Sequence, residues 1–382
     1  MSPAWVHGAP FVPKDDAQVL ATVPSRATDP RAAELHALQR AWRANPRVLS
    51  GALALAQRHF DEVAARGDPR HIGYAQRALQ PWWDLPAPPP AVRVLRAKLV
   101  QFDHRFAEAL ADLDAALQAE PGNTDAWAWR TAIHMVQADY AEARRGCKQI
   151  AALAPGLIAT ACLAQVDAIT GQAALAAAAL RAALQAHPQA SAEERLWALT
   201  RLAETEERRG EHAAAEAAFR EALSLGLPDV YLQAAFADFL LDRKRAAEVM
   251  AQLQTGPATA RADVLLLRLA LAAQATRHAD AALWADQLSA RFAAARLRGD
   301  SSHRKEEARF LLSIKGDTRQ ALPLAQQNWA QQREPADARL LLEAALAAKD
   351  AKAAQPVLDW MQRNAVESVA LQALARQIAS AR

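Results

Sequence analysis

Apolar residues recur along most of this chain at the three-and-four spacing of an amphipathic helix. In the clearest segment they form a broad stripe along one helical face, at positions i, i+3, i+4, i+7, i+10 and i+11: Phe106, Ala109, Leu110, Leu113, Ala116 and Leu117. Ala and Leu dominate the apolar positions and favour helix, whereas Val, Ile and Tyr, which favour strands, are few. The pattern therefore predicts an all-α protein.

The helical pattern itself repeats. The stripe that begins at Phe106 returns at Tyr140, and the prolines that close successive units lie 34, 33 and 40 residues apart: Pro121, Pro155, Pro188 and Pro228. The second helix of each unit carries a small residue that lets two helices approach closely: Ala109, Ala143, Ala176 and Ala215. Two helical patterns within one period of this length indicate stacked helix hairpins, none of which can bury its apolar stripe alone.

With Trp127 opening a first helix and a proline closing each unit, the chain resembles the tetratricopeptide repeat (TPR) family, in its bacterial type. The resemblance covers about residues 91–364 and implies a right-handed α-solenoid of antiparallel helix pairs. The usual turn glycine is replaced by His104 and Ala138. Looser markers predict further pairs beyond Pro228, at Tyr231/Ala247, Leu266/Ala282, Ala308/Ala321 and Ala338/Ala354.

The same pattern divides the chain into four parts. Residues 1–28 hold four prolines and no helical period, which predicts an extended leader that docks on the body through its apolar residues. Residues 29–90 are expected to form irregular helices ending in a proline-rich strap, where the run from Pro81 to Pro90 stops all helix. Residues 91–364 form the helix-pair array, and residues 365–382 a C-terminal capping helix.

Charge changes this picture little. The 45 basic and 42 acidic residues give a net charge of only +3, and they alternate along most helices instead of clustering by sign. Nucleic-acid binding, which calls for a basic face, is therefore disfavoured.

The most apolar window, Leu157 to Ile169, is too short to span a bilayer. Residues 1–24 lack the signal-peptide pattern. Localisation stays open, with the periplasm, after removal of a signal, favoured over the cytoplasm.

Motifs for chemistry are missing. Cys147 and Cys162 are the only cysteines and form no Cys-x-x-Cys, so they are interpreted as small core residues, with a disulfide between them left open. The ten histidines show no metal-ligand spacing, and neither a phosphate-binding loop nor a nucleophile elbow occurs. We therefore expect no cofactor, no metal and no catalytic residues, and an enzyme or regulator is the disfavoured alternative.

Arginines and tryptophans are the most conspicuous candidates for binding. Arginine recurs in the first helices, and we interpret it as packing along the Ala-rich surface while its head pairs with a carboxylate. That set is Arg96, Arg130, Arg268, Arg309 and Arg339. The pair Trp82-Trp83 is interpreted as a wedge that holds the linker on the first repeats. Trp197 is expected on an exposed polar face with Thr200, Arg201, Glu204 and Arg208, as a possible hot spot against casual surface packing.

The leading hypothesis is a non-catalytic scaffold whose concave face binds another protein or an extended peptide. A periplasmic or envelope assembly or export adaptor is the alternative, and the oligomeric state is not predicted. Candidate partner-binding residues lie on the first helices, away from the packing stripe: Lys98, Gln101, Asp125, Trp129, Gln165, Trp197, Glu204, Arg208, Phe236 and Gln274.

Overall fold

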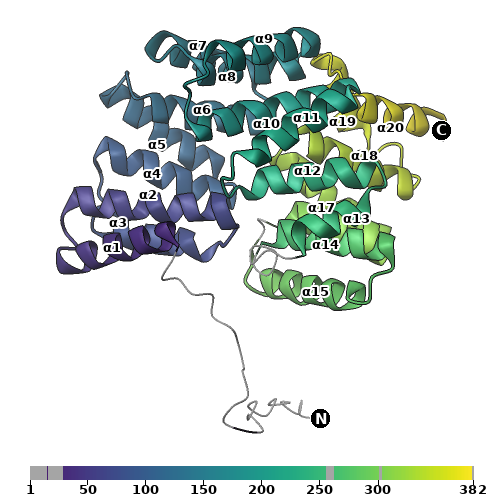
Figure 1. Ribbon diagram of the computed structural model, residues 1–382, viewed down its shortest axis with the longest axis horizontal. Helices are drawn as coiled ribbons and strands as arrows, with labels where there is room; N and C mark the ends of the chain where they lie inside the picture. Colours follow the sequence, from purple (N-terminus) through teal and green to yellow (C-terminus); the bar gives the residue numbers. More distant parts are fainter. Residues whose placement is uncertain (1–14, 16–28, 255–261, 301–302, 381–382) are drawn as a thin grey trace.

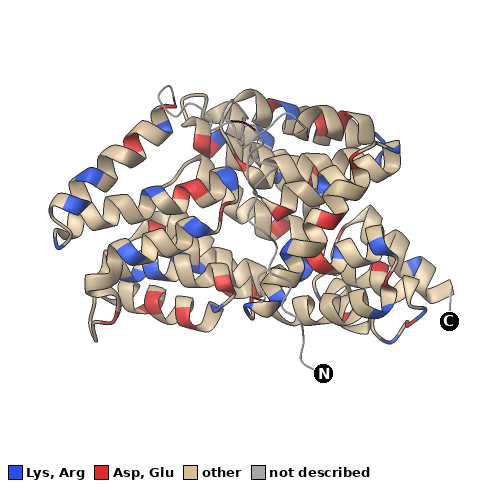
Figure 2. Cartoon of the chain, turned by 90° about the horizontal axis from the view of Figure 1, so that it is seen from below, with Lys and Arg blue, Asp and Glu red and all other residues tan. Residues whose placement is uncertain are grey.

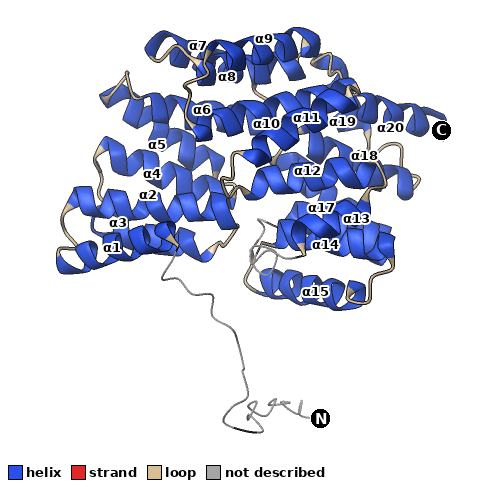
Figure 3. Ribbon diagram, in the orientation of Figure 1, coloured by secondary structure: helices blue, strands red, loops and turns tan. Residues whose placement is uncertain are grey.

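The computed structural model describes residue 15 and residues 29–254, 262–300 and 303–380, so that, apart from Asp15, the leader expected at residues 1–28 lies outside the described residues. Within these ranges every regular element is a helix (Figure 3). Consecutive helices stack as antiparallel pairs in an all-α solenoid (Figure 1). The fold class predicted from the Ala- and Leu-rich pattern is confirmed.

Three helices open the described chain: α1 (Pro30–Ala44), α2 (Leu49–Arg66) and α3 (Arg70–Trp83). The Asp29 side chain caps α1 by accepting a hydrogen bond from the Arg31 backbone N–H at 3.0 Å. Helix α2 ends at Gly67 in the left-handed region, with φ 63°. A Cβ at this position would lie 2.7 Å from the Cβ of Ala262. Glycine is therefore required both by the turn and by the close approach of a distant segment.

The proline-rich run corrects one expectation. Helix α3 continues through Pro81 to Trp83, and the break spans only residues 84–89 before α4 begins at Pro90. Pro81 lies in the last turn, so it removes one backbone hydrogen bond without interrupting a long ladder. Trp82 and Trp83 pack against the core that contains Leu79 and Leu95, and this burial extends the helix past the proline. The tryptophan pair packs on the first repeats as expected, but as the end of α3 and not as part of a linker.

From α4 onward the helices come in pairs, followed by a single last helix. The pairs are α4 (Pro90–Val100) with α5 (Phe106–Ala119), α6 (Thr124–Val136) with α7 (Tyr140–Leu153), α8 (Leu157–Ile169) with α9 (Ala173–Ala186), α10 (Ala192–Arg209) with α11 (His212–Ser224), α12 (Val230–Asp242) with α13 (Ala246–Leu253), α14 (Asp263–Thr276) with α15 (Ala281–Leu297), α16 (Arg304–Phe310) with α17 (Thr318–Gln331), and α18 (Pro335–Ala347) with α19 (Gln355–Arg363). The last helix is α20 (Val369–Ser380).

Small residues allow the helices of a pair to pack closely. Each alanine that marks a second helix is fully buried, with a relative exposure of 0–1%: Ala109, Ala143, Ala176 and Ala215. A methyl group at such a contact fills the space between two backbones and leaves none for a longer side chain. The sequence marker therefore coincides with a fully buried position in each pair.

The turns inside the first two pairs keep their shape without glycine. His104 and Ala138 both adopt the left-handed conformation, each with φ 60°, as Gly171 (φ 80°) and Gly210 (φ 84°) do in the next two pairs. An L-residue in this region carries a steric penalty of about 1–2 kcal/mol because its Cβ crowds the following carbonyl. Packing of the two flanking helices therefore holds these turns against a local preference.

Cys147 of α7 and Cys162 of α8 form a disulfide, the possibility that the sequence left open. Both cysteines are buried in a core shared with α18, α19 and α20, which contains Tyr140 and Trp360. The bond thus fixes two consecutive pairs to each other where the C-terminal helices pack on them.

The solenoid closes on itself through contacts between segments far apart in the sequence. The Ala173 backbone N–H at the start of α9 donates to Glu367 Oε2 at 2.7 Å, and the Arg333 N–H donates to the Val136 carbonyl at 2.7 Å. Figure 1 shows α19 and α20 lying beside the layer of α10 and α11. No described helix combines the length and the apolar character that crossing a bilayer requires.

Candidate functional site

Charged side chains of the first helices meet one another from α10 to α18. We call this set the inner face. Its members are Arg201, Glu204, Glu207, Arg208, Tyr231, Asp238, Asp242, Arg268, Lys305, Arg309, Glu334, Asp337 and Arg339.

Asp238 of α12 lies at the centre of the inner face. One carboxylate oxygen pairs with Arg268 of α14 at 2.7 Å and the other with Arg309 of α16 at 2.7 Å. Burial opposes ionisation of Asp238, but the two guanidinium groups outweigh it and lower its pKa to about 2. Asp238 is therefore a fixed anion that joins three repeats.

The inner face also connects repeats that are not neighbours. Arg339 of α18 donates to both carboxylate oxygens of Asp242 at the end of α12, with Nη2–Oδ1 at 2.7 Å. The same guanidinium donates to Glu343 at 2.7 Å. The fork of arginine matches two carboxylate oxygens in one plane, which makes such a contact directional.

Tyr231 of α12 presents the most accessible aromatic surface of the inner face. Its hydroxyl donates to Glu204 of α10, and the Arg201 guanidinium lies 4.9 Å from its ring centre. Arg201 in turn pairs with Glu204 at 3.1 Å. Half of the Tyr231 residue surface is exposed (50%), yet burial raises the pKa of its hydroxyl. The residue is thus half-exposed while its hydroxyl and its ring both contact charged groups of α10.

Lys305 and Glu334 complete this region. Lys305 Nζ of α16 lies 3.4 Å from Asp337 Oδ1 of α18. Burial disfavours the ammonium form, but Asp337 and Glu334 outweigh it and raise the Lys305 pKa. Glu334 and Asp337 form the capping box of α18, and the Glu334 N–H donates to Asp337 at 3.0 Å. Burial raises the pKa of Glu334 in spite of Lys305.

Arg208 differs from the other inner-face arginines. Its only polar side-chain partner is the Thr205 hydroxyl, which accepts from Nη2 at 3.3 Å, and its Nε is buried without a partner among the described residues. Burial lowers its pKa, and Glu204 only partly offsets this effect. Beside it, burial and Asp242 raise the pKa of Glu207 to about 7, although Arg243 lies 3.5 Å away.

Four of the predicted residues lie together at the N-terminal side. Lys98 of α4 is buried, and its ammonium contacts Asp125 Oδ2 at 2.6 Å and the Trp129 ring at 5.7 Å from the ring centre. Gln101 donates to the Lys98 carbonyl. Trp129 packs edge-on against Phe60 of α2 at 5.3 Å. These contacts involve α2, which the sequence did not associate with the site.

The remaining predicted residues are placed differently. Phe236 is 4% exposed and packs against Phe219 and Phe239, so its place on a binding face is corrected to the core. Trp197 is half-buried against two apolar cores instead of standing exposed. Gln165 is half-buried and Gln274 is exposed. Glu204 and Arg208 lie on the inner face described above.

The polar side of α10 also differs from expectation. Thr200 is 2% exposed and donates to the Leu196 carbonyl at 2.7 Å, and the Arg201 side chain is 11% exposed. These residues face other first helices, so a polar stripe that looked solvated is enclosed by neighbouring repeats. Tyr231, Asp238, Lys305 and Glu334 were missed because only the packing of repeats brings them together.

The recurring arginines pair with carboxylates, as the sequence predicted. Arg96 contacts Asp112 at 2.6 Å, and Arg130 contacts Asp114 at 2.8 Å and Glu142 at 3.2 Å. Basic and acidic residues are interspersed along the helices (Figure 2). In the described ranges no three His, Cys, Asp or Glu side chains are grouped so that they could hold a metal ion.

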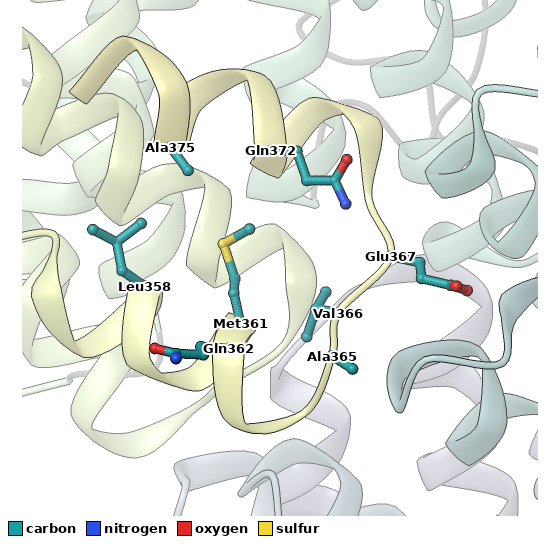
Figure 4. Close-up of a pocket in the computed structure, with 8 residues that line it drawn as sticks. All are labelled: Leu358, Met361, Gln362, Ala365, Val366, Glu367, Gln372 and Ala375. Atoms are coloured by element: carbon teal, nitrogen blue, oxygen red, sulfur yellow. The ribbon is translucent and has the colours of Figure 1, made fainter. Parts of the chain in front are cut away.

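A shallow hollow of about 450 Å³ lies between α19 and α20 (Figure 4). Its lining is mostly apolar, with amide and carboxylate groups at the rim: Leu358, Met361, Gln362, Ala365, Val366, Glu367, Gln372 and Ala375. Glu367 already accepts the Ala173 N–H. The hollow is thus a surface depression at the end of the array.

Comparison with known proteins identifies a fold. No family model and no curated protein matches the chain. Among solved structures, a chain of the APC/C hetero-tetramer Cut9–Hcn1 has a TM-score of 0.51 at 13% identity, over 87% of this chain and 63% of that one. A tetratricopeptide repeat protein from Parabacteroides merdae (TM-score 0.39, 16% identity, 63% of this chain and 93% of that one) and yeast Tom70 (0.39, 14%, 91% and 62%) are also similar. The chain therefore has a TPR-like fold.

Proposed function

We propose that this protein is a non-catalytic scaffold that binds an extended segment of another protein along its inner face. The observation that carries the proposal is the half-exposed Tyr231 of α12, whose hydroxyl and ring contact Glu204 and Arg201 of α10. A partly exposed tyrosine supplies apolar contact area and a polar tip, the combination that is enriched at protein interfaces.

The carboxylates that contact arginines around Tyr231 fit a binding role better than a catalytic one. Asp238, Asp242 and Glu204 each contact an arginine directly, so their charges are already neutralised. A general base needs an available lone pair and a pKa near the working pH. Paired carboxylates provide fixed hydrogen-bonding groups instead, which suit the peptide groups of an extended chain.

The proposal is tested by placing a photo-reactive benzoylphenylalanine at position 231 in the full chain, with position 175 as control. Leu175 lies on α9, a second helix, and is 68% exposed. We expect a host-cell lysate to give a discrete cross-linked partner from position 231 and none from position 175. Equal adducts at both positions, or adducts only at position 175, would contradict an inner-face site.

A second candidate is an assembly or export adaptor in the periplasm or another oxidising compartment. The disulfide between Cys147 and Cys162 favours it, because such bonds persist mainly outside the reducing cytosol. Fractionation of the native host checks this directly. Recovery of the protein in the cytosolic fraction with both thiols free would contradict the oxidising-compartment proposal.

A further inference from the structure

Arg208 lies within the inner face but lacks the partner that every comparable arginine has. Arg201, Arg268, Arg309 and Arg339 each contact a carboxylate of the first helices. Arg208 contacts only a neutral hydroxyl, at 3.3 Å. Among the described residues no carboxylate reaches its guanidinium, and its Nε–H points at no acceptor.

We propose that Arg208 receives the carboxylate of an acidic side chain from the extended partner segment. This inference rests on the proposed scaffold function and specifies its ligand chemistry. An arginine that is surrounded by protein and unpaired raises the free energy of the folded state, because its charge has lost water without gaining a counter-ion. A ligand carboxylate would supply two acceptors for the planar guanidinium.

The groups near Arg208 would tolerate an added negative charge. Glu204 is engaged by Arg201 and by the Tyr231 hydroxyl. Glu207 has a pKa of about 7, so near neutral pH a large share of it carries no charge. Tyr231 of α12 contacts Arg201 and Glu204, which lie two turns and one turn before Arg208 on the same helix. The ligand carboxylate would therefore meet a cation whose neighbouring carboxylates are already paired or in large part protonated.

The proposed occupant is a side chain and not a chain terminus, because the scaffold proposal places an extended segment along the inner face. Such a segment meets the charged groups of α12 to α18 as well as Arg208 of α10. The residue that it places at Arg208 is then an internal one.

The test selects 12-residue peptides from a displayed random library on the immobilised full chain. Peptides that cross-link to benzoylphenylalanine at position 231 are then synthesised with each Asp or Glu replaced by its amide, and separately with an amidated C-terminus. Their affinities are measured for the unmodified chain, Arg208→Gln, Arg208→Lys and the control Arg319→Gln. Arg319 is an exposed arginine on the second helix α17.

We expect that one acidic side chain of each selected peptide binds Arg208. Its replacement by the amide should lower affinity for the unmodified chain about tenfold, with no further loss on Arg208→Gln. Arg208→Lys should be intermediate, because it keeps the charge but loses the fork. Arg319→Gln should bind like the unmodified chain. The melting temperature of Arg208→Gln should be equal or higher, which separates lost binding from lost folding.

Three other outcomes are decisive. Peptides that cross-link at position 231 but bind Arg208→Gln unchanged would overturn this inference and leave the proposed function standing. Loss of binding on amidation of the C-terminus alone would overturn the assignment to a side chain. A selection that yields no peptide cross-linking at position 231 would overturn the inner-face function and this inference with it.

Discussion

The Trp360 indole Nε1 donates a hydrogen bond at 3.1 Å to the Tyr140 hydroxyl, across 220 residues of sequence. Both groups are buried, and the Trp360 ring also packs edge-on against Trp329. The contact joins α19 to α7 and belongs to the core that holds the disulfide. One hydrogen bond thus marks the place where the end of the solenoid meets its middle.

Replacing Tyr140 by Phe should lower the free energy of unfolding by about 1–3 kcal/mol, since it leaves the buried Trp360 N–H without an acceptor. Urea denaturation followed by circular dichroism measures the change. The control is Tyr74→Phe, at a residue that is 49% exposed. Equal midpoints for the two variants would mean that the Trp360 N–H finds another partner.

Ala143→Trp should disrupt folding or lower stability by about 1–3 kcal/mol or more, because Ala143 is 0% exposed at a close helix contact. Ala111→Trp, at an exposed position of α5, is the matched control. The free energy of unfolding of Arg208→Ala should equal that of the unmodified chain within about 0.5 kcal/mol, or be higher. Similar thermal midpoints for Ala143→Trp and Ala111→Trp would show that Ala143 of α7 does not lie at a close helix contact.

Ala138→Gly should raise stability by about 1 kcal/mol. Ala138 has φ 60°, where glycine avoids the Cβ clash, and the turn does not lie inside a helix where glycine would be costly. Thermal unfolding of the two chains at one pH measures the difference. A lower melting temperature for the glycine variant would mean that the gain in unfolded-chain entropy exceeds the relief of strain.

Glu207 predicts a pH dependence of stability. Its folded pKa, about 7, is raised above the ordinary 4.5, so the folded state holds the proton more tightly than the unfolded state. The free energy of unfolding contributed by this group is therefore highest below pH 4.5 and falls as the pH rises through 7, by about 3 kcal/mol at most. Glu207→Gln should flatten the profile between pH 5 and 8. An unchanged slope in that variant would assign the dependence to other groups.

Reduction of the disulfide should lower stability by roughly 3 kcal/mol, the value expected for a closed loop of about 15 residues. Denaturation with and without dithiothreitol, compared with the Cys147→Ser, Cys162→Ser double variant, measures it. The double variant should be insensitive to dithiothreitol. A reductant effect of equal size in that variant would exclude the disulfide as its cause.

Local pattern was sufficient to predict the helices and their pairing, but not the contacts between distant repeats. The buried alanines and the arginine–carboxylate pairs follow from spacing along one helix and its neighbour. The site depends on how α10, α12, α16 and α18 converge. The repeat spacing of the sequence does not predict these contacts between distant helices. Phe236 was misplaced for a similar reason: on a first helix flanked on two sides, an apolar residue off the main stripe is still buried.

Contacts such as Arg339–Asp242, Ala173–Glu367 and Trp360–Tyr140 give the chain a property that an open repeat array lacks. In an open array each unit contacts only its neighbours, so terminal units can fray or be deleted one at a time. Here the last helices complete the surface of units in the middle of the chain. Truncation after α17 would uncover Tyr140 and the disulfide core, and this protein should melt as one cooperative unit instead of losing its repeats in sequence.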